Sequence, residues 1–181
     1  ASIYEPVYLV GHANFIPLYS NLFSKWLNRA VSTWERVLDA WPEHPPLYLE
    51  NVREYDPRPL SDLLSELSER QVKFCFDLGH WSSYGGGSQY QNLPAWIQTL
   101  SPFLAQLHLH DNDGVADQHL GLGQGTIPWL ELFAGLEFLD LVPGLTLEPH
   151  SLEDLENSWS FIRNHISWFN RLGLRMQDLP L

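Results

Sequence analysis

The sequence predicts an α/β fold of the (β/α)-barrel type, in which parallel strands alternate with helices. Five short apolar runs indicate strands, and longer segments with helical spacing separate them. An ionisable residue follows or closes every run, which places polar groups at the carboxyl ends of strands, where such barrels carry their functional sites. The runs are Val7–Val10, Leu47–Leu49, Val72–Phe76, Leu104–Leu109 and Leu145–Leu147.

Five helical segments complete the alternation. The first, Leu18–Ala40, carries apolar residues at intervals of three and four, and Leu60, Leu63, Leu64 and Leu67 form one stripe of the second. Ser151 with Asp154 resembles a helix N-cap followed by an acidic third residue. The other segments are Pro59–Arg70, Pro94–Leu100, Ile127–Leu139 and Ser151–Leu172. The linkers Pro42–Pro46 and Ser82–Gln91 show no domain boundary, so residues 1–181 are expected to form a single, partial barrel domain.

The amino-acid composition disfavours some classes of function. The chain has 181 residues, 44% of them hydrophobic, which suits one globular core, and no apolar run is long enough to span a bilayer. A net charge of −12 disfavours binding to the phosphate backbone of nucleic acid. The single cysteine, Cys75, cannot form an internal disulfide, which fits a reducing compartment. With no targeting segment recognised, a cytoplasmic location is expected.

Side-chain alternation sorts the residues at the strand ends. It places Glu50, Asp77, His108 and Glu148 on one face of the sheet. The opposite face carries Leu47, Leu49, Phe74, Phe76, Leu107, Leu109, Leu145 and Leu147, which are expected to pack against helices.

Three carboxylates and an imidazole that converge in an apolar barrel repel one another unless a cation neutralises them. A single acidic residue at a strand end is more often a helix cap or a loop contact, but four groups of the same parity favour a metal site. Oxygen-rich ligation with one nitrogen suits Mn²⁺, Mg²⁺, Co²⁺ or Zn²⁺.

A second group consists of His80, Asp117 and His119. These side chains could hold another metal or grip a substrate's oxygens; alternatively, Asp117 caps its loop and the two histidines are partly exposed. His80, His110, Asp117 and His119 are the predicted substrate contacts. His12 is a further candidate ligand, although backbone groups could equally satisfy it, and His150 follows Glu148 closely enough to reach the pocket.

Five stretches resemble, in order, the motifs of the xylose isomerase-like TIM barrels, a superfamily that includes sugar phosphate isomerases and epimerases and endonuclease IV-type nucleases. They are Leu47–Val52, Phe74–Trp81, Leu107–Gly114, Asp117–Trp129 and Leu145–His150. The resemblance implies that Glu50, Asp77, His108 and Glu148 form the shared metal-binding quartet. It also implies that His80 contacts substrate, as in the epimerases, or binds a third metal with Asp117 and His119, as in the nucleases. His12 matches a histidine that binds another metal in the nucleases.

The resemblance also indicates an incomplete barrel. Members have eight strands, and by motif order this chain begins at the fourth, so it is expected to hold the C-terminal five βα units. A missing N-terminal segment or a second chain is expected to complete the barrel. An open sheet exposes apolar surface, which predicts low stability alone or association.

Three functions remain open. In the first, a metal-dependent sugar or sugar-phosphate isomerase or epimerase uses Glu50 and Glu148 to move a proton while the metal stabilises an enediolate-like charge. The loop Ser82–Gln91, with its three glycines, could cover such a site. In the second, the metals activate water to cleave a phosphodiester, more readily a small one than DNA because the chain is acidic. In the third, the chain is a barrel fragment that binds metal without activity alone.

Overall fold

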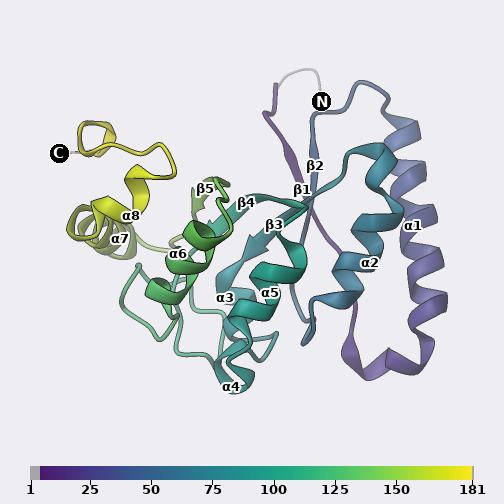
Figure 1. The fold of residues 1–181 in the computed structure, drawn as a ribbon, viewed down its shortest axis with the longest axis horizontal. Helices are drawn as coiled ribbons and strands as arrows, with labels where there is room; N and C mark the ends of the chain where they lie inside the picture. The colour runs from purple at the N-terminus through teal and green to yellow at the C-terminus, as the bar shows by residue number, and fades with distance from the viewer. Residues whose placement is uncertain (1–4, 181) are drawn as a thin grey trace.

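The structure is a computed structural model that describes residues 5–180. Its strands form one parallel sheet in the order β1-β2-β3-β4-β5, so strands consecutive in the chain are neighbours in the sheet (Figure 1). Successive βα units of a barrel have this arrangement, which confirms the predicted fold class and the partial barrel. The strands are β1 (Leu9–His12), β2 (Leu47–Glu50), β3 (Lys73–Asp77), β4 (Leu104–Leu109) and β5 (Gly144–Leu147).

The first strand lies two residues later than the apolar run Val7–Val10 predicts. Gly11 ends that run in the sequence but remains within the strand, paired with Leu49 of β2. A side chain at Gly11 would overlap the indole of Trp34, so the glycine lets the helix pack closely against the strand.

The helices lie close to the predicted segments, and three of these segments each divide into two helices. The segment Leu18–Ala40 forms a 3-10 helix, η1, and then α1, while Pro59–Arg70 forms α2 and a short η2. The segment Ser151–Leu172 divides at His165 into α7 and α8, and Ser151 caps α7 by accepting a hydrogen bond from the Asp154 N–H at 3.0 Å. The bounds are η1 (Pro17–Leu22), α1 (Phe23–Ala40), α2 (Arg58–Glu66), η2 (Ser68–Arg70), α5 (Leu93–Leu100), α6 (Trp129–Phe138), α7 (Leu152–Asn164), α8 (Ile166–Asn170) and η3 (Met176–Asp178).

Two short helices, α3 (Leu78–Ser82) and α4 (Gly87–Tyr90), were not predicted. The second lies inside Ser82–Gln91, so the expectation of a continuous loop there was wrong. A side chain at Gly87 would overlap the indole of Trp81, which is itself buried. Gly87 therefore allows this segment to pack against the body of the protein.

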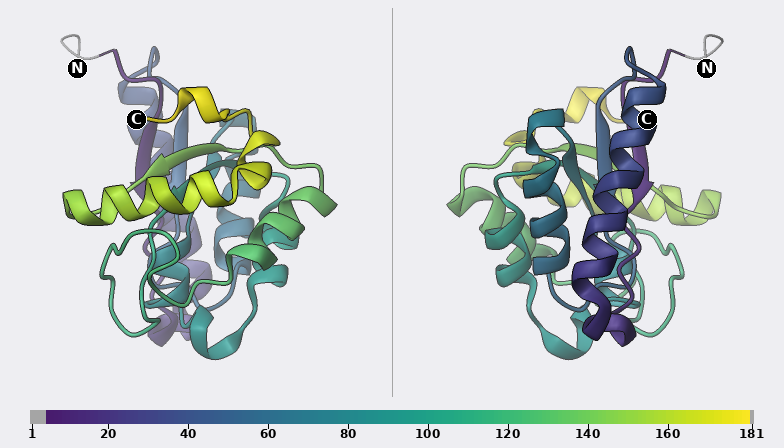
Figure 2. Two further views of the ribbon diagram at one scale, coloured as in Figure 1. Left: turned by 90° about the vertical axis from the view of Figure 1, so that its left-hand side faces the viewer. Right: turned by 90° about the vertical axis from the view of Figure 1, so that its right-hand side faces the viewer.

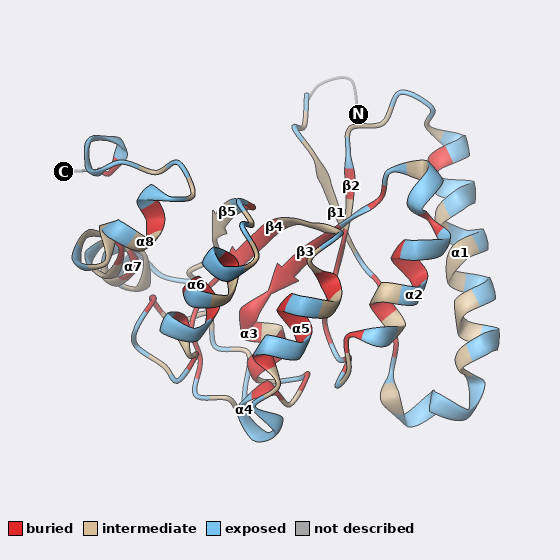
Figure 3. Cartoon of the chain, in the orientation of Figure 1, coloured by how far each residue is buried: buried red, intermediate tan, exposed pale blue. Residues whose placement is uncertain are grey.

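The outer face of the sheet carries the core. Figure 1 shows α1, α2, α5 and α6 in a row along one side of the sheet, and Figure 3 shows the buried residues concentrated between these layers. Phe76 of β3 stacks on Trp96 of α5, with ring centroids 5.6 Å apart. Each such buried side chain stabilises the fold by about 1.5–3 kcal/mol. The outward residues of β2, β3 and β4 are buried as predicted: Leu47, Leu49, Phe74, Phe76, Leu107 and Leu109.

The other face of the sheet is concave. Tyr8, directly before β1, hydrogen-bonds Thr146 of β5, although β1 and β5 are opposite edges. Only a strongly curved sheet brings these side chains together, and the two side views in Figure 2 show that curvature. Among residues 5–180 the five strands do not close into a ring. No helix in the same range combines the length and apolar character needed to cross a bilayer.

Candidate metal centre

The four residues predicted on one face converge at the carboxyl ends of their strands. One ligand atom from each of Glu50, Asp77, His108 and Glu148 can be chosen so that all lie within 4.8 Å of one another. His108 Nδ1 lies 2.9 Å from Glu50 Oε1 and 3.2 Å from Glu148 Oε1. It is 3.8 Å from Asp77 Oδ2, so three carboxylates surround one imidazole nitrogen.

The backbone around Asp77 explains its placement. Beyond the last paired residues of β2 and β3, the Asn51 side chain takes over the pairing: its amide donates to the Asp77 carbonyl at 2.8 Å, and its carbonyl accepts from the Asp77 N–H at 2.9 Å. Asp77 also caps α3 by accepting a hydrogen bond from the His80 N–H at 2.6 Å. Sequence reasoning missed Asn51, because an asparagine directly after a strand gives no local signal of this role.

The charges of this cluster favour a cation. Burial opposes protonation of His108, but its hydrogen bond with Glu50 and the surrounding carboxylates outweigh burial and raise the pKa of His108. In Glu148, burial is the largest cause of the shift, and it raises the pKa of the carboxyl. For Asp77, burial is outweighed by the hydrogen bond with His110, which lowers the pKa of that carboxyl. Carboxylates that stabilise positive charge on an imidazole do the same for a metal ion that displaces the proton.

The second predicted group also converges. Asp117 Oδ2 lies 3.4 Å from His80 Nε2 and 3.3 Å from His119 Nε2. His80 Nδ1 lies 3.0 Å from the Asn51 carbonyl, and His119 Nδ1 lies 2.6 Å from the Glu148 carbonyl. Each Nδ1 can therefore donate its proton to a backbone oxygen, which leaves each Nε2 with a lone pair facing the carboxylate.

Two such lone pairs around a carboxylate require a positive charge between them, either protons or a metal ion. Burial opposes protonation of His80, but the hydrogen bond with Asp117 and the nearby carboxylates outweigh burial and raise its pKa to about 9. The buried Asp117 Oδ1 has no hydrogen-bond partner among the described residues. This orphaned oxygen and the N/O donor set fit a second metal ion.

His12 joins the quartet from β1. Its Nε2 lies 3.1 Å from Glu50 Oε2, and 51% of its side chain is exposed. His12 also lines a hollow of about 420 Å³ beside α1, together with Lys25 and Arg29. The structure therefore brings His12 next to the predicted ligands, at the most exposed point of the cluster.

His110 and His150 form a stack with His119. The centroids of the His110 and His119 rings are 3.7 Å apart, and those of His119 and His150 are 3.8 Å apart. The His110 side chain has no exposed surface, and its Nε2 lies 3.2 Å from Asp77 Oδ1. His110, one of the predicted substrate contacts, is therefore fully buried in this structure and contacts Asp77. The exposed His150 stacks on His119.

Asp111 is a further buried carboxylate that sequence reasoning did not single out. It accepts hydrogen bonds from the backbone N–H groups of Gly123 and Ile127 and from the indole of Trp129. These bonds hold the loop that carries Asp117 and His119 against β4. Asp111 is therefore a structural residue, and its adjacency to His110 was the only signal in the sequence.

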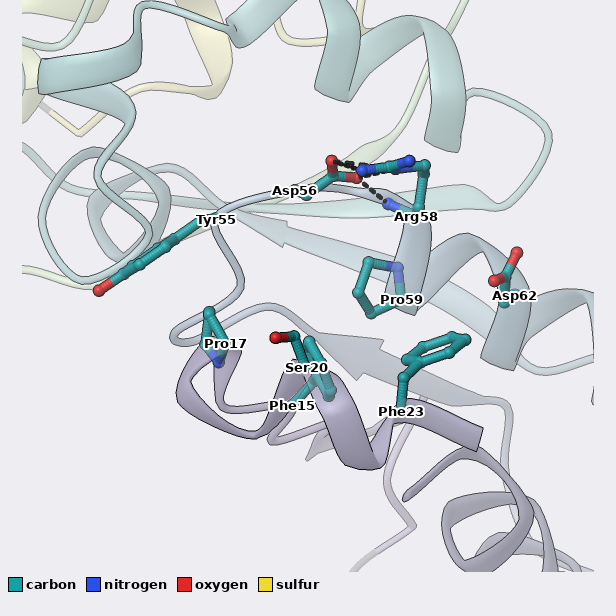
Figure 4. Close-up of a pocket in the computed structure, with 9 residues that line it drawn as sticks. All are labelled: Phe15, Pro17, Ser20, Phe23, Tyr55, Asp56, Arg58, Pro59 and Asp62. Atoms are coloured by element: carbon teal, nitrogen blue, oxygen red, sulfur yellow. Dashed lines mark hydrogen bonds and ion pairs between the residues drawn. The ribbon is translucent and has the colours of Figure 1, made fainter. Parts of the chain in front are cut away.

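A separate hollow of about 340 Å³ lies between η1 and the start of α2 (Figure 4). Phe15, Phe23 and Pro59 give it apolar walls, and the ion pair of Asp56 with Arg58 lies at its rim. None of the predicted ligands lines it. The candidate chemistry is therefore on the concave face of the sheet and not in this hollow.

The fold and this cluster define a parallel α/β protein of the barrel type with polar groups gathered at its strand ends. The chain belongs to the xylose isomerase-like TIM barrel family, whose profile matches residues 10–165. This confirms the resemblance found in the sequence motifs.

A curated relative and solved structures are similar to this chain in sequence or fold. The uncharacterised protein MJ1311 of Methanocaldococcus jannaschii is 23% identical over 170 residues, which cover 90% of this chain and 57% of that protein. The crystal structure of a D-tagatose 3-epimerase-like protein superposes with a TM-score of 0.72 at 23% identity, covering 92% of this chain and 64% of that one. The TTHB071 protein from Thermus thermophilus, soaked with ZnCl2, gives a TM-score of 0.64 at 26% identity, covering 87% and 60%. The chain thus spans less than two thirds of the length of these proteins.

Proposed function

We propose that this chain carries the metal-binding part of a divalent-metal-dependent sugar or sugar-phosphate isomerase or epimerase. The observation that carries the proposal is the convergence of Glu50, Asp77, His108 and Glu148 within 4.8 Å at the carboxyl ends of four consecutive strands. Active sites of (β/α) barrels are built at this end. The donor set of three carboxylates and one imidazole fits Mn²⁺, Zn²⁺, Mg²⁺ or Co²⁺.

Glu50 and Glu148 are the proposed acid–base pair. Both approach His108 through one carboxylate oxygen, and the second oxygen of each can take up or release a proton. In Glu50 this second oxygen lies 3.1 Å from His12 Nε2. The raised pKa of Glu148, caused mainly by burial, suits proton transfer closer to neutral pH. Its side chain is 30% exposed, so substrate can reach it. A divalent metal bound here supplies Lewis-acid stabilisation of negative charge on the substrate's oxygens.

The comparisons support this assignment through the D-tagatose 3-epimerase-like protein, which shares the fold. The structure of the Thermus thermophilus protein was obtained with ZnCl2, which supports zinc as one candidate metal. Substrates of the proposed reaction are small molecules, and the net charge of −12 continues to disfavour nucleic acid.

The second candidate is hydrolysis of a small phosphodiester by more than one metal ion. The group of His80, Asp117 and His119 favours it, because their facing lone pairs and the orphaned Asp117 oxygen fit a further cation. His12, 3.1 Å from Glu50, offers another ligand beside the quartet. Multi-metal sites activate water and stabilise the leaving oxygen in such reactions.

Elemental analysis of metal-loaded protein separates the two candidates. One metal ion per chain supports the isomerase or epimerase, whereas two or three support the hydrolase. No metal after incubation with Zn²⁺, Mn²⁺ or Co²⁺ overturns both. Glu50→Gln should lower the stoichiometry, and the exposed Glu131→Gln is the matched control.

Two activity measurements complete the test. An isomerase or epimerase exchanges a carbon-bound proton of a ketose with solvent deuterium, which NMR detects. A phosphodiesterase instead releases p-nitrophenol from bis(p-nitrophenyl) phosphate. Deuterium exchange that requires metal supports the first candidate, and p-nitrophenol release without exchange supports the second.

A further inference from the structure

His110 is the one histidine of the site whose side chain has no exposed surface. It follows His108 by two residues and therefore continues the same face of β4. Its Nε2 lies 3.2 Å from Asp77 Oδ1 and 3.4 Å from Asp77 Oδ2. The same nitrogen lies 3.8 Å from Asp117 Oδ1, so His110 stands between the two ligand groups.

Packing fixes the position of this ring. On one side, a side chain at Gly79 would overlap the imidazole, so glycine is needed for the close approach. On the other side, the His119 ring is stacked 3.7 Å away with an interplanar angle of 2°. The ring of His110 is thus held between α3 and the loop after β4 and has little freedom to turn.

The hydrogen-bond partners fix which nitrogen donates. The buried His110 Nδ1 has no partner within residues 5–180, whereas Nε2 faces two carboxylates. A carboxylate can only accept, so Nε2 carries the proton and donates to Asp77. The shorter contact of His110 Nε2 is with Asp77 Oδ1, whereas Asp77 Oδ2 lies 3.8 Å from His108 Nδ1.

We propose that His110 is a positioning residue, which orients the Asp77 carboxylate for metal binding and connects it to the group around Asp117. This inference rests on the proposed function, because it assumes that Asp77 binds the metal. It assigns His110 a role other than substrate contact. Hydrogen-bond partners of metal ligands typically change metal affinity 10- to 100-fold when they are removed.

The test uses the full chain and Co²⁺ or Zn²⁺ alone. His110→Phe keeps a planar ring between Gly79 and His119 but removes the donor. His110→Gln keeps an N–H donor near the position of Nε2. We expect His110→Phe to weaken metal binding by about 10- to 100-fold and to alter the visible spectrum of bound Co²⁺, and His110→Gln to restore most of both. His44→Leu, a histidine outside the site, is the control and should leave both unchanged.

Each possible result supports or overturns the inference about His110. Wild-type affinity and spectrum in His110→Phe overturn the inference while leaving the proposed function standing. Equal losses in His110→Phe and His110→Gln also overturn it, because a loss of packing then explains both. If wild-type protein binds no metal, the proposed function and the inference fail together. Thermal unfolding is measured in parallel, and His110→Leu replaces His110→Phe if the larger ring prevents folding.

Discussion

The hydroxyl oxygens of Tyr8 and Thr146 lie 2.8 Å apart, although the two residues belong to opposite edges of the sheet. Thr146 also accepts a hydrogen bond from the Gln106 amide at 2.7 Å, and Tyr8 stacks on Tyr48 with centroids 5.1 Å apart. These contacts lie on the concave face that also carries the candidate ligands. They link Tyr8, directly before the first strand, to the last strand, so side chains stabilise the curvature that gathers the candidate ligands.

Removing this link should destabilise the fold modestly. Tyr8→Phe and Thr146→Val are each expected to lower the free energy of unfolding by about 1 kcal/mol or more, because each removes one partner of a partly buried hydrogen bond. Thr146→Val also removes the acceptor of the Gln106 hydrogen bond. In a double-mutant cycle by urea unfolding, the double variant should lose less than the sum of the single variants. Tyr19→Phe, at an exposed tyrosine, is the control. Strictly additive losses would show that the two hydroxyls do not interact in solution.

Glu148→Gln should abolish metal-dependent turnover. The substitution preserves the shape of the side chain but removes the carboxylate proposed to transfer the proton, so kcat should fall by about 100-fold or more. Metal binding should weaken as well, since one of three carboxylates is lost, and turnover is therefore measured at saturating metal. The exposed Glu153→Gln on α7 is the control. Full activity of Glu148→Gln under these conditions removes Glu148 from the proposed acid–base pair.

Glu54 gives the protein a pH-dependent stability. Burial raises the pKa of its carboxyl above the ordinary 4.5, although the N–H groups of Val52, Phe15 and Arg53 donate to it. An acid whose pKa is higher in the folded state binds more protons when folded. Its contribution to stability therefore falls as the pH rises from 4.5 through the raised pKa and is constant above it.

The comparison of wild type with Glu54→Gln isolates this effect. Glutamine does not titrate. The free energy of unfolding of wild type should therefore fall relative to that of Glu54→Gln as the pH rises through this window, by at most about 1.4 kcal/mol per pH unit. Urea unfolding at several pH values measures it, with Glu131→Gln as an exposed control. A difference that stays constant across the window, or that moves in favour of wild type, contradicts the assigned shift.

The convergence of the four candidate ligands was predictable, because it depends on strand periodicity. Once the strands β2 to β5 were recognised, alternation placed their four ionisable residues on one face, and the structure brings them together: Glu50, Asp77, His108 and Glu148. Asn51 and the burial of His110 were not predictable, because they depend on contacts with residues 26 and 33 positions away. Likewise α4 was not predicted, because three consecutive glycines indicate a loop unless the packing of Gly87 against Trp81 is known.

Gly79 offers a last prediction, since it is the residue that makes room for His110. In a helix, alanine is favoured over glycine by about 1 kcal/mol, but at Gly79 the added methyl group would overlap a ring that His119 prevents from moving away. We expect Gly79→Ala to lower the free energy of unfolding by about 1–3 kcal/mol and to weaken Zn²⁺ binding, because His110 is displaced from Asp77.

Gly135→Ala is the matched control, also within a helix. Its methyl group would meet the end of the Ile97 side chain, 2.9 Å away, which can turn aside. This variant should bind Zn²⁺ like wild type and be as stable or up to about 1 kcal/mol more stable. Thermal unfolding and Zn²⁺ titration of both variants measure the contrast. If Gly79→Ala matches Gly135→Ala in both measurements, then His110 does not depend on Gly79 for its place beside Asp77.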